Sequence, residues 1–325
     1  MDTFPKSIFE FQNRFGTEEQ CAAELAKLRW PNGFLCPNCG HDDGRQLTGR
    51  REIQCALCRH QTSVTSGTIF HRTHLPLVCW FWIIYQVAHD KGGASATRLA
   101  SQLNRPYKTI WHVLHKIRYA MGSRDSRITL AGLIEMDEAL LGPEARRPAK
   151  DDDDPNPEVQ RRKPRKKPWG AKPRDRGKRK TITEVLILVE AERFHAGNVA
   201  MHPLQNKHFD TLREVIQEKV DEGQWFRTDA HHTHWVLRQV AEKFSIKKSD
   251  EAMGCEALPV VHRVISLLKH FLMGTYFGVS VKYLAGYLKE FCFRFMRREK
   301  EHTLSYSLLR ACAFALPVTY AELKL

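Results

Sequence analysis

Hydrophobic positions recur along this chain with two different periods. Between residues 75 and 121 they follow helical spacing, in LVCWFWIIYQVAHD, then SATRLASQL, then KTIWHVLHKIRYAM. The breaker GG separates the first two stretches, and the short turn NRPY separates the last two. The pattern predicts one strongly apolar helix followed by two amphipathic helices joined by a short turn.

Two amphipathic helices joined by a turn of this length are typical of a helix-turn-helix. We therefore expect residues 76–125 to form a helical DNA-binding region, with a plain helical hairpin as the alternative. The second helix would then present four polar side chains to a DNA groove, namely Lys108, Thr109, His112 and Lys116.

From residue 126 to 305 the pattern changes to short β-branched runs mixed with helical stretches. ITLAGLIEMDEALLG, TITEVLILVEAE, NVAMHPL and QWFRTDAH are predicted strands, and HFDTLREVIQEKVDEG and HTHWVLRQVAEKF are predicted helices. Strands come first and then alternate with helices. This order favours a mixed α/β sheet flanked by helices, and residues 306–325 are expected to be a C-terminal tail.

Residues 143–180 interrupt this region with an acidic run followed by a basic, proline-rich one. Such a composition cannot bury a core, so we expect a mobile insertion. It is either a solvated loop or an arm that binds DNA phosphates. The basic residues proposed for phosphate contact are Arg165, Lys166 and Lys167.

Two Cys-x-x-Cys pairs stand near the N-terminus, Cys36 with Cys39 and Cys55 with Cys58. This spacing is typical of a zinc ribbon, in which four thiolates close a tetrahedral structural site. Residues 1–75 are therefore the predicted zinc-ribbon module. The alternative is two unrelated pairs of reduced cysteines.

The formal net charge of +14 indicates a polyanionic partner, and nucleic acid is a common one. The first residues lack the apolar core of an export signal. The most apolar run, LPLVCWFWIIYQVA, is shorter than the roughly 20 residues that cross a bilayer. We expect a cytosolic protein with no membrane segment.

Two aspartates follow predicted strands, Asp137 in LIEMD and Asp229 in QWFRTD. Carboxylates at strand ends converge on one edge of an α/β sheet, where they can hold Mg²⁺ for phosphoryl transfer. An aspartate in that position is also a common turn or helix cap. Both interpretations remain open from the residues alone.

The order of these modules resembles the zinc-ribbon transposases of bacterial insertion sequences. The resemblance rests on SGTIFHRTHLPLVCWFW, EMDEALLG, TDAHHTHW and the closing VVHRVISLLKHFLMGTYFGVSVKYLAGYLKEFCFRFMRR, and it covers nearly the whole chain. It implies a multidomain protein in which the zinc ribbon and the helical DNA-binding unit precede a ribonuclease-H-like domain. It further implies that the protein binds the ends of its element as a dimer or larger assembly, cuts and joins DNA, and is associated with the nucleoid.

By this resemblance Asp137 and Asp229 are the first two members of an acidic metal-binding triad. The third comes from the helix that starts near Val260, where His262 and Lys269 share one side of the helical wheel. His262 takes the place of the third ligand, and Lys269 would hold a phosphate. The expected ions are structural Zn²⁺ and catalytic Mg²⁺ or Mn²⁺.

Several positions depart from the family pattern. An imidazole at His262 replaces a side-chain oxygen and shifts the preference toward Mn²⁺, Leu267 and Met296 replace polar residues, and Glu256 is a fallback carboxylate. Three hypotheses remain: an active transposase, a transposase-derived DNA-binding regulator without catalysis, and an unrelated zinc-ribbon RNA-binding or transcription factor.

Overall fold

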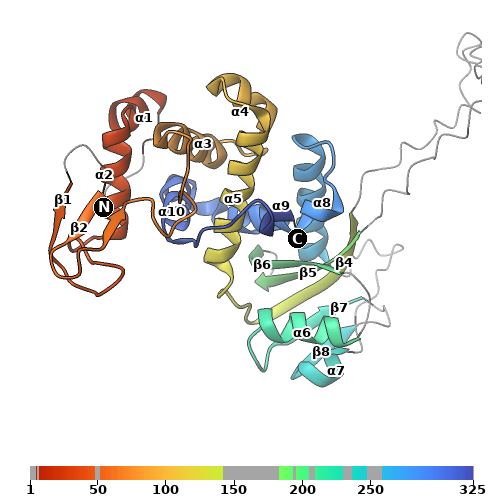
Figure 1. Ribbon diagram of the computed structural model, residues 1–325. Helices are drawn as coiled ribbons and strands as arrows, with labels where there is room; N and C mark the ends of the chain where they lie inside the picture. The colour runs from red at the N-terminus through yellow and green to blue at the C-terminus, as the bar shows by residue number, and fades with distance from the viewer. Residues whose placement is uncertain are drawn as a thin grey trace, which may run out of the picture.

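The structure is a computed structural model. It describes residue 5 and residues 7–47, 52–141, 183–192, 195–204, 209–229, 236–246 and 258–324. Figure 1 shows the zinc-ribbon strands at one end of the molecule, a group of helices in the middle and a five-stranded sheet at the other end.

Two helices precede the ribbon, α1 (Ile8–Phe15) and α2 (Glu18–Arg29). The Ser7 hydroxyl accepts a hydrogen bond from the Glu10 N–H at the start of α1. A capping box formed by Thr17 and Gln20 begins α2. The expected zinc-ribbon module of residues 1–75 therefore contains a helical part that packs against the middle of the molecule.

The ribbon is a three-stranded antiparallel sheet of β1 (Gly44–Gln46), β2 (Glu52–Cys55) and β3 (Gln61–Ser63). The three predicted helices follow as α3 (Leu77–His89), α4 (Ala96–Leu103) and α5 (Tyr107–Asp125). Asn104, in the left-handed conformation, ends α4. The short turn before α5 therefore has helix-turn-helix length.

Helix α5 lies at the centre of this group, and α10 (Glu301–Phe314) packs against it and against α3. Leu308 and Cys312 of α10 are fully buried beside the core of α2 and α3. The C-terminal tail expected from residue 306 thus begins inside a core helix. Its apolar side faces helices more than 170 positions earlier in the chain, partners that local sequence does not reveal.

The second half of the chain forms a five-stranded sheet. Its strands are β4 (Leu133–Leu141), β5 (Thr183–Glu192), β6 (His195–Leu204), β7 (Trp225–Thr228) and β8 (Lys243–Ile246). The strand order is β6-β5-β4-β7-β8. The first three strands pair antiparallel, and β7 and β8 continue parallel to β4.

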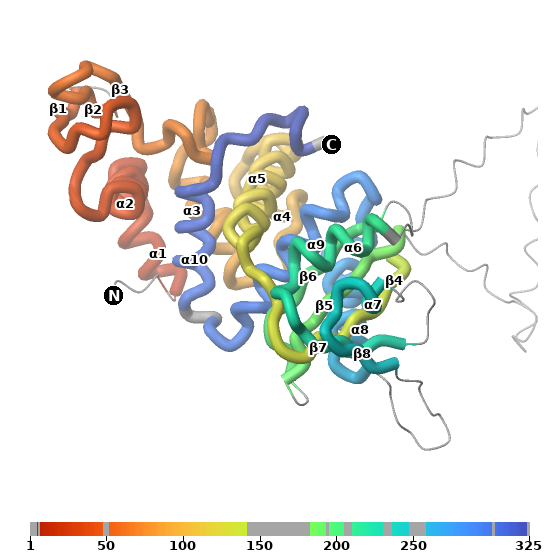
Figure 2. The backbone as a smooth tube through the Cα atoms, turned by 90° about the horizontal axis from the view of Figure 1, so that it is seen from below, coloured from red at the N-terminus to blue at the C-terminus, as the bar shows by residue number. Residues whose placement is uncertain are grey.

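Helices cover both faces of this sheet (Figure 2). On one face α6 (Phe209–Lys219) and α7 (Leu237–Val240) pack over Ile134 and Met136. On the other face α8 (Pro259–Gly274) and α9 (Val281–Phe295) pack over Ala139 and Leu141. Because side chains alternate along a strand, the odd-numbered residues of β4 face α8.

The helix expected from HTHWVLRQVAEKF is wrong over its last four residues, 241–244. The described part of α7 ends at Val240, Ala241 is extended, and residues 243–246 form strand β8 beside β7. Phe244 packs against the core under α6. Residues 243–246 pair with β7, and no local sequence pattern predicts this pairing. The pairing overrides the helical periodicity of the segment.

A buried ionic network joins the central helices to the sheet region. The Arg118 guanidinium of α5 lies 2.8 Å from the Glu290 carboxylate of α9, and both residues are 2% exposed. Arg294 also contacts Glu290, at 3.1 Å, and donates to the carbonyls of Val87 and Asp90 at the C-terminal end of α3. Because a buried charge is costly without its partner, this network fixes the two regions together.

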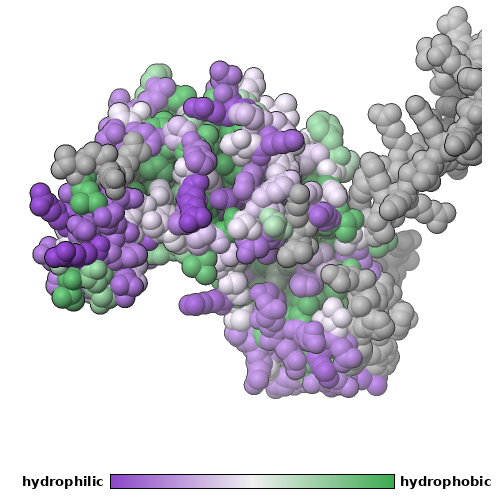
Figure 3. Space-filling view, in the orientation of Figure 1, coloured by the Kyte–Doolittle hydropathy of each residue, from purple (hydrophilic) through white to green (hydrophobic). Residues whose placement is uncertain are grey.

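Hydrophilic residues predominate on the face shown in Figure 3. Among the described residues no helix has both the length and the apolar character needed to cross a membrane. The most apolar helix, α3, has 13 residues and packs into the core.

Candidate active site and zinc site

Four thiolates meet at the base of the ribbon. The sulfur atoms of Cys36 and Cys58 lie 3.6 Å apart, as do those of Cys39 and Cys55, and all four lie within 4.8 Å of one another. Sulfurs on a tetrahedral zinc ion, each at about 2.3 Å from it, are separated by about 3.8 Å. The four cysteines thus fit structural zinc and leave it no open position.

The two cysteine pairs are held in matching turns. The Cys36 N–H donates to the His41 carbonyl, and the Cys55 N–H donates to the His60 carbonyl. Directly after each pair the backbone enters the left-handed region, at Gly40 with φ 73° and at Arg59 with φ 54°. In one turn glycine occupies this position without strain, and in the other an arginine does so at a cost.

Asp137 and Asp229 occupy matching positions on neighbouring parallel strands. The last ladder pair of β4 and β7 is Met136 with Thr228, and each aspartate is the next residue. Asp229 follows the end of β7, as expected. The prediction that Asp137 ends its strand is wrong, because β4 continues to Leu141 where Ala139 and Leu141 pack under α8.

His262, in the first turn of α8, reaches the same place from above the sheet. Its Nε2 lies 3.3 Å from Asp137 Oδ2, with the imidazole 37% and the carboxylate 18% exposed. Two ligands at right angles on one octahedral ion, each about 2.1 Å from it, would lie about 3.0 Å apart. We call Asp137, Asp229 and His262 the acidic site.

Asp137 lies in a partly buried, polar environment with a second carboxylate nearby. Burial raises the pKa of Asp137, and the nearby charge of Asp229 raises it further. The Glu138 N–H, which donates to Asp137 at 2.8 Å, and His262 oppose this rise. Among the described residues, the four cysteines are the one group of three or more such side chains whose ligand atoms all converge, so the three side chains of the acidic site are more widely spaced.

A third carboxylate lies behind the acidic site. Glu135, two residues before Asp137 on the same face of β4, is completely buried. It accepts hydrogen bonds from the Val260 and Val261 N–H groups of α8, at 2.9 and 2.8 Å. It also pairs with Arg227 of β7 at 3.2 Å. Neither Glu135 nor Arg227 is among the site residues that the sequence predicts.

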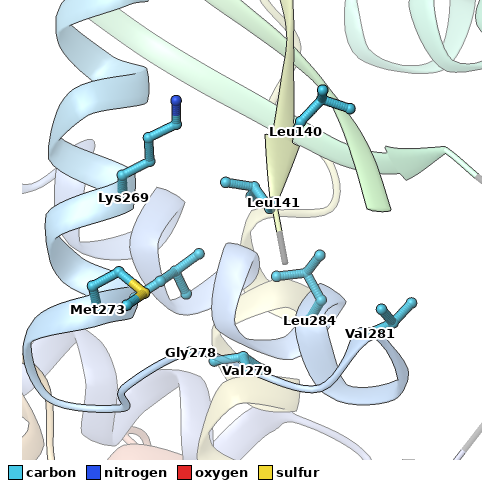
Figure 4. Close-up of a pocket in the computed structure, with 9 residues that line it drawn as sticks. Leu140, Leu141, Lys269, Met273, Gly278, Val279, Val281 and Leu284 are labelled. Atoms are coloured by element: carbon cyan, nitrogen blue, oxygen red, sulfur yellow. The ribbon is translucent and has the colours of Figure 1, made fainter. Parts of the chain in front are cut away.

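Lys269 lies two turns beyond His262 on α8, and its side chain is exposed. Beside it is a hollow of about 200 Å³, whose lining includes Leu141, Met273 and Leu284. Figure 4 shows the Lys269 ammonium pointing away from Met273 and Leu284, which line the hollow. On the same helix Val264, Leu268 and Phe271 are buried, whereas Leu267 is 48% exposed.

The four residues of α5 that were expected to face DNA differ in their exposure. Lys108 and Thr109, in the first turn, are exposed. His112 is partly buried, its ring 5.4 Å from that of Tyr320, and burial lowers its pKa. Lys116 donates to the Ile69 carbonyl at 3.2 Å, and burial lowers its pKa as well. Of these four residues, only Lys108 and Thr109 are therefore open to a DNA groove.

Four other sequence predictions lie outside the described residues. They are the phosphate contacts of Arg165, Lys166 and Lys167 within the insertion at 143–180, and the fallback carboxylate Glu256.

Two family models match parts of this chain. The model of the ISXO2-like transposase domain matches residues 129–296, just over half of the chain. The model of the transposase zinc-ribbon domain matches residues 16–61. The first match contains the acidic site, and the second contains the four cysteines.

One curated relative is described as an uncharacterized protein in transposable element ISH50 of Halobacterium salinarum. It is 28% identical over 127 residues, which are 38% of this chain and 42% of the relative. The match thus spans less than half of the relative's length. No solved structure matches the chain.

Proposed function

Because this chain belongs to the ISXO2-like family of transposases, we propose that it binds the inverted ends of an insertion sequence and cuts and joins DNA there in a divalent-metal-dependent reaction. The observation that carries the proposal is the placement of three side chains from three segments: Asp137 and Asp229 each directly follow the last ladder pair of β4 and β7, Asp229 acts on the charge of Asp137, and His262 contacts Asp137 at 3.3 Å.

The sheet supports a ribonuclease-H-like catalytic domain. Numbered within this domain, its strand order is 3-2-1-4-5, with the first three strands antiparallel and the last two parallel to the first. In this arrangement the central strand and its parallel neighbour carry the two aspartates, and a helix over the sheet carries the third residue.

In this proposal the acidic site holds Mg²⁺ or Mn²⁺. The carboxylates supply oxygen ligands and His262 supplies one nitrogen, a combination that suits Mn²⁺ better than an all-oxygen site would. The chemistry that the bound ions supply is activation of the attacking oxygen and stabilisation of the leaving oxygen at phosphorus. Until a divalent cation neutralises Asp137 and Asp229, the negative charges of these two carboxylates repel anions from the site.

Other parts of the chain are proposed to hold the DNA. The exposed ammonium of Lys269 lies along α8 from His262, where it would contact a backbone phosphate of the bound strand. Lys108 and Thr109 are exposed at the start of α5, and the net charge of +14 favours a polyanion. Handling two DNA ends together requires a homodimer or larger assembly, working at the nucleoid.

A cleavage assay on DNA that carries the element's ends tests the proposal. We expect strand nicking that requires Mn²⁺ or Mg²⁺ and falls at least a thousandfold in Asp229→Asn, while DNA binding persists. Asp210→Asn, which removes an exposed carboxylate from α6, is the matched control and should keep full activity. Binding without cleavage by the unmodified chain would favour the transposase-derived regulator, to which the imidazole at position 262 points.

A further inference from the structure

We propose that Glu135 is a positioning residue for the reaction, which sets the spacing of the three elements that carry the acidic site. It touches neither substrate nor metal and acts through the backbone of α8 and the side chain of Arg227. The inference rests on the proposed function, since it takes Asp137, Asp229 and His262 as the metal ligands.

Glu135 supplies the N-terminal cap that α8 lacks locally. The first residues of a helix have N–H groups without intrahelical acceptors, and Leu258, at the N-cap, offers no side-chain acceptor. Pro259 has no N–H, and the His262 N–H already bonds to the Leu258 carbonyl. The two remaining donors, those of Val260 and Val261, both bond to one oxygen of Glu135.

The other oxygen of Glu135 holds strand β7. It accepts from the Arg227 guanidinium at 3.2 Å, and the two residues are also register partners across the parallel β4–β7 ladder. Glu135 is fully buried, whereas the Arg227 side chain is 29% exposed. One carboxylate therefore bonds both to α8, which packs over β4, and to β7, which pairs with β4.

Each contact of Glu135 lies one or two residues before a member of the acidic site. Glu135 itself precedes Asp137 by two residues on the same face of β4. Arg227 precedes Asp229 by two residues. Val260 and Val261 precede His262 by two residues and one residue. A shift of α8 or β7 relative to Glu135 is thus passed directly to a ligand one or two residues away.

A purely stabilising role makes a different prediction. A buried carboxylate with several donors stabilises any fold, and Glu190 shows this elsewhere in the same sheet. Its oxygens accept from the Ala131 and Asn198 N–H groups at 2.9 and 2.7 Å, and it is 9% exposed. Glu190 contacts neither α8 nor β7 in these bonds, so it is a matched control for the loss of a buried, backbone-bonded carboxylate.

The experiment compares Glu135→Gln and Glu190→Gln in the zinc-loaded full chain, below the unfolding temperature of both. Mn²⁺ binding is measured without DNA by electron paramagnetic resonance, and half-saturating Mn²⁺ is measured in DNA cleavage. We expect Glu135→Gln to weaken Mn²⁺ binding ten- to a hundredfold and to regain much of its cleavage rate at high Mn²⁺. Glu190→Gln should keep the unmodified affinity even if it unfolds at a lower temperature.

Two results separate this inference from the proposed function. Unchanged Mn²⁺ affinity in Glu135→Gln, while Asp137→Asn abolishes binding, would overturn the positioning role alone. If the unmodified chain neither binds Mn²⁺ at the acidic site nor cleaves DNA, the proposed function fails and the positioning role fails with it. Should Glu135→Gln not fold, Arg227→Gln keeps the helix cap, and it should weaken Mn²⁺ binding by a smaller factor. Unchanged affinity in that variant would also count against the role.

Discussion

The imidazole Nε2 of His262 lies 3.3 Å from Asp137 Oδ2, which joins the first turn of α8 to the middle of the central strand. The two residues are far apart in sequence and meet because α8 packs across β4 and β5. In the proposed metal site, this contact would place a nitrogen ligand where the family resemblance implies a third side chain for the metal. The metal preference of that site would then depend on a single residue.

Replacing His262 should change which ion supports cleavage. Because Mg²⁺ prefers oxygen ligands and an imidazole suits Mn²⁺, His262→Glu is expected to raise the ratio of Mg²⁺-supported to Mn²⁺-supported cleavage about tenfold. His270→Glu adds the same charge to an exposed position of the same helix and should leave the ratio unchanged. Equal ratios in both variants would argue against His262 as a ligand.

Loss of one ribbon cysteine should release the zinc without unfolding the sheet. Cys55→Ser removes one of the four converging sulfurs, and a structural zinc ion contributes roughly 10 kcal/mol or more to the folding of a small domain. We expect zinc content to fall from one per chain to near zero, while amide protection in β5 persists. Cys79→Ser, outside the ribbon, should keep the zinc. Zinc retained by Cys55→Ser would refute the four-sulfur site.

Arg59 stands in a backbone conformation that favours glycine, with φ 54°. Arg59→Gly should therefore stabilise the zinc-loaded chain by about 0.5–1 kcal/mol, as measured by the midpoint of urea unfolding of the ribbon. Arg45→Gly, at an exposed strand position of β1, should destabilise it instead. The same sign for both variants would show that strain at Arg59 is negligible.

His115 should make the helical core sensitive to acid. It is 4% exposed, its ring lies 4.0 Å from that of Trp111, and burial lowers its pKa to about 3, with Arg118 adding to the effect. The unfolded chain takes up this proton near pH 6.5 and the folded chain does not. The unfolding free energy should therefore be highest above pH 6.5 and fall as pH drops toward 3, by up to about 1.4 kcal/mol per pH unit.

Urea unfolding of the unmodified chain and of His115→Gln at pH 6.5 and 5.0 isolates this contribution, since both chains share every other titrating group. The variant should lose less stability between the two pH values. Identical losses would mean that another group carries the acid sensitivity.

The sequence predicts those features that depend on local spacing. The cysteine pairs, the helices from Leu77 to Asp125 and strands β5 and β6 follow from patterns within one segment. Features that depend on distant partners could not be predicted. Asp137 lies inside its strand because Ala139 and Leu141 pack under α8, and α8 is capped by Glu135, 125 residues before Val260.

Distant partners also explain why two elements, β8 and α10, differ from the elements that the sequence predicts. Strand β8 exists because β7 offers it an edge, and α10 is a core helix because α2, α3 and α5 cover its apolar side. Helical periodicity places Lys116 on a polar face of α5. In the folded chain, however, its ammonium donates a hydrogen bond to the Ile69 carbonyl.

Crystals of the zinc-loaded chain soaked in Mn²⁺ would test the proposed metal site directly. We expect an anomalous scattering peak, at the manganese-sensitive wavelength, in contact with Asp137, Asp229 and His262. A chain that carries its zinc at the four cysteines but shows no manganese at these three side chains, in the presence of saturating Mn²⁺, would contradict it.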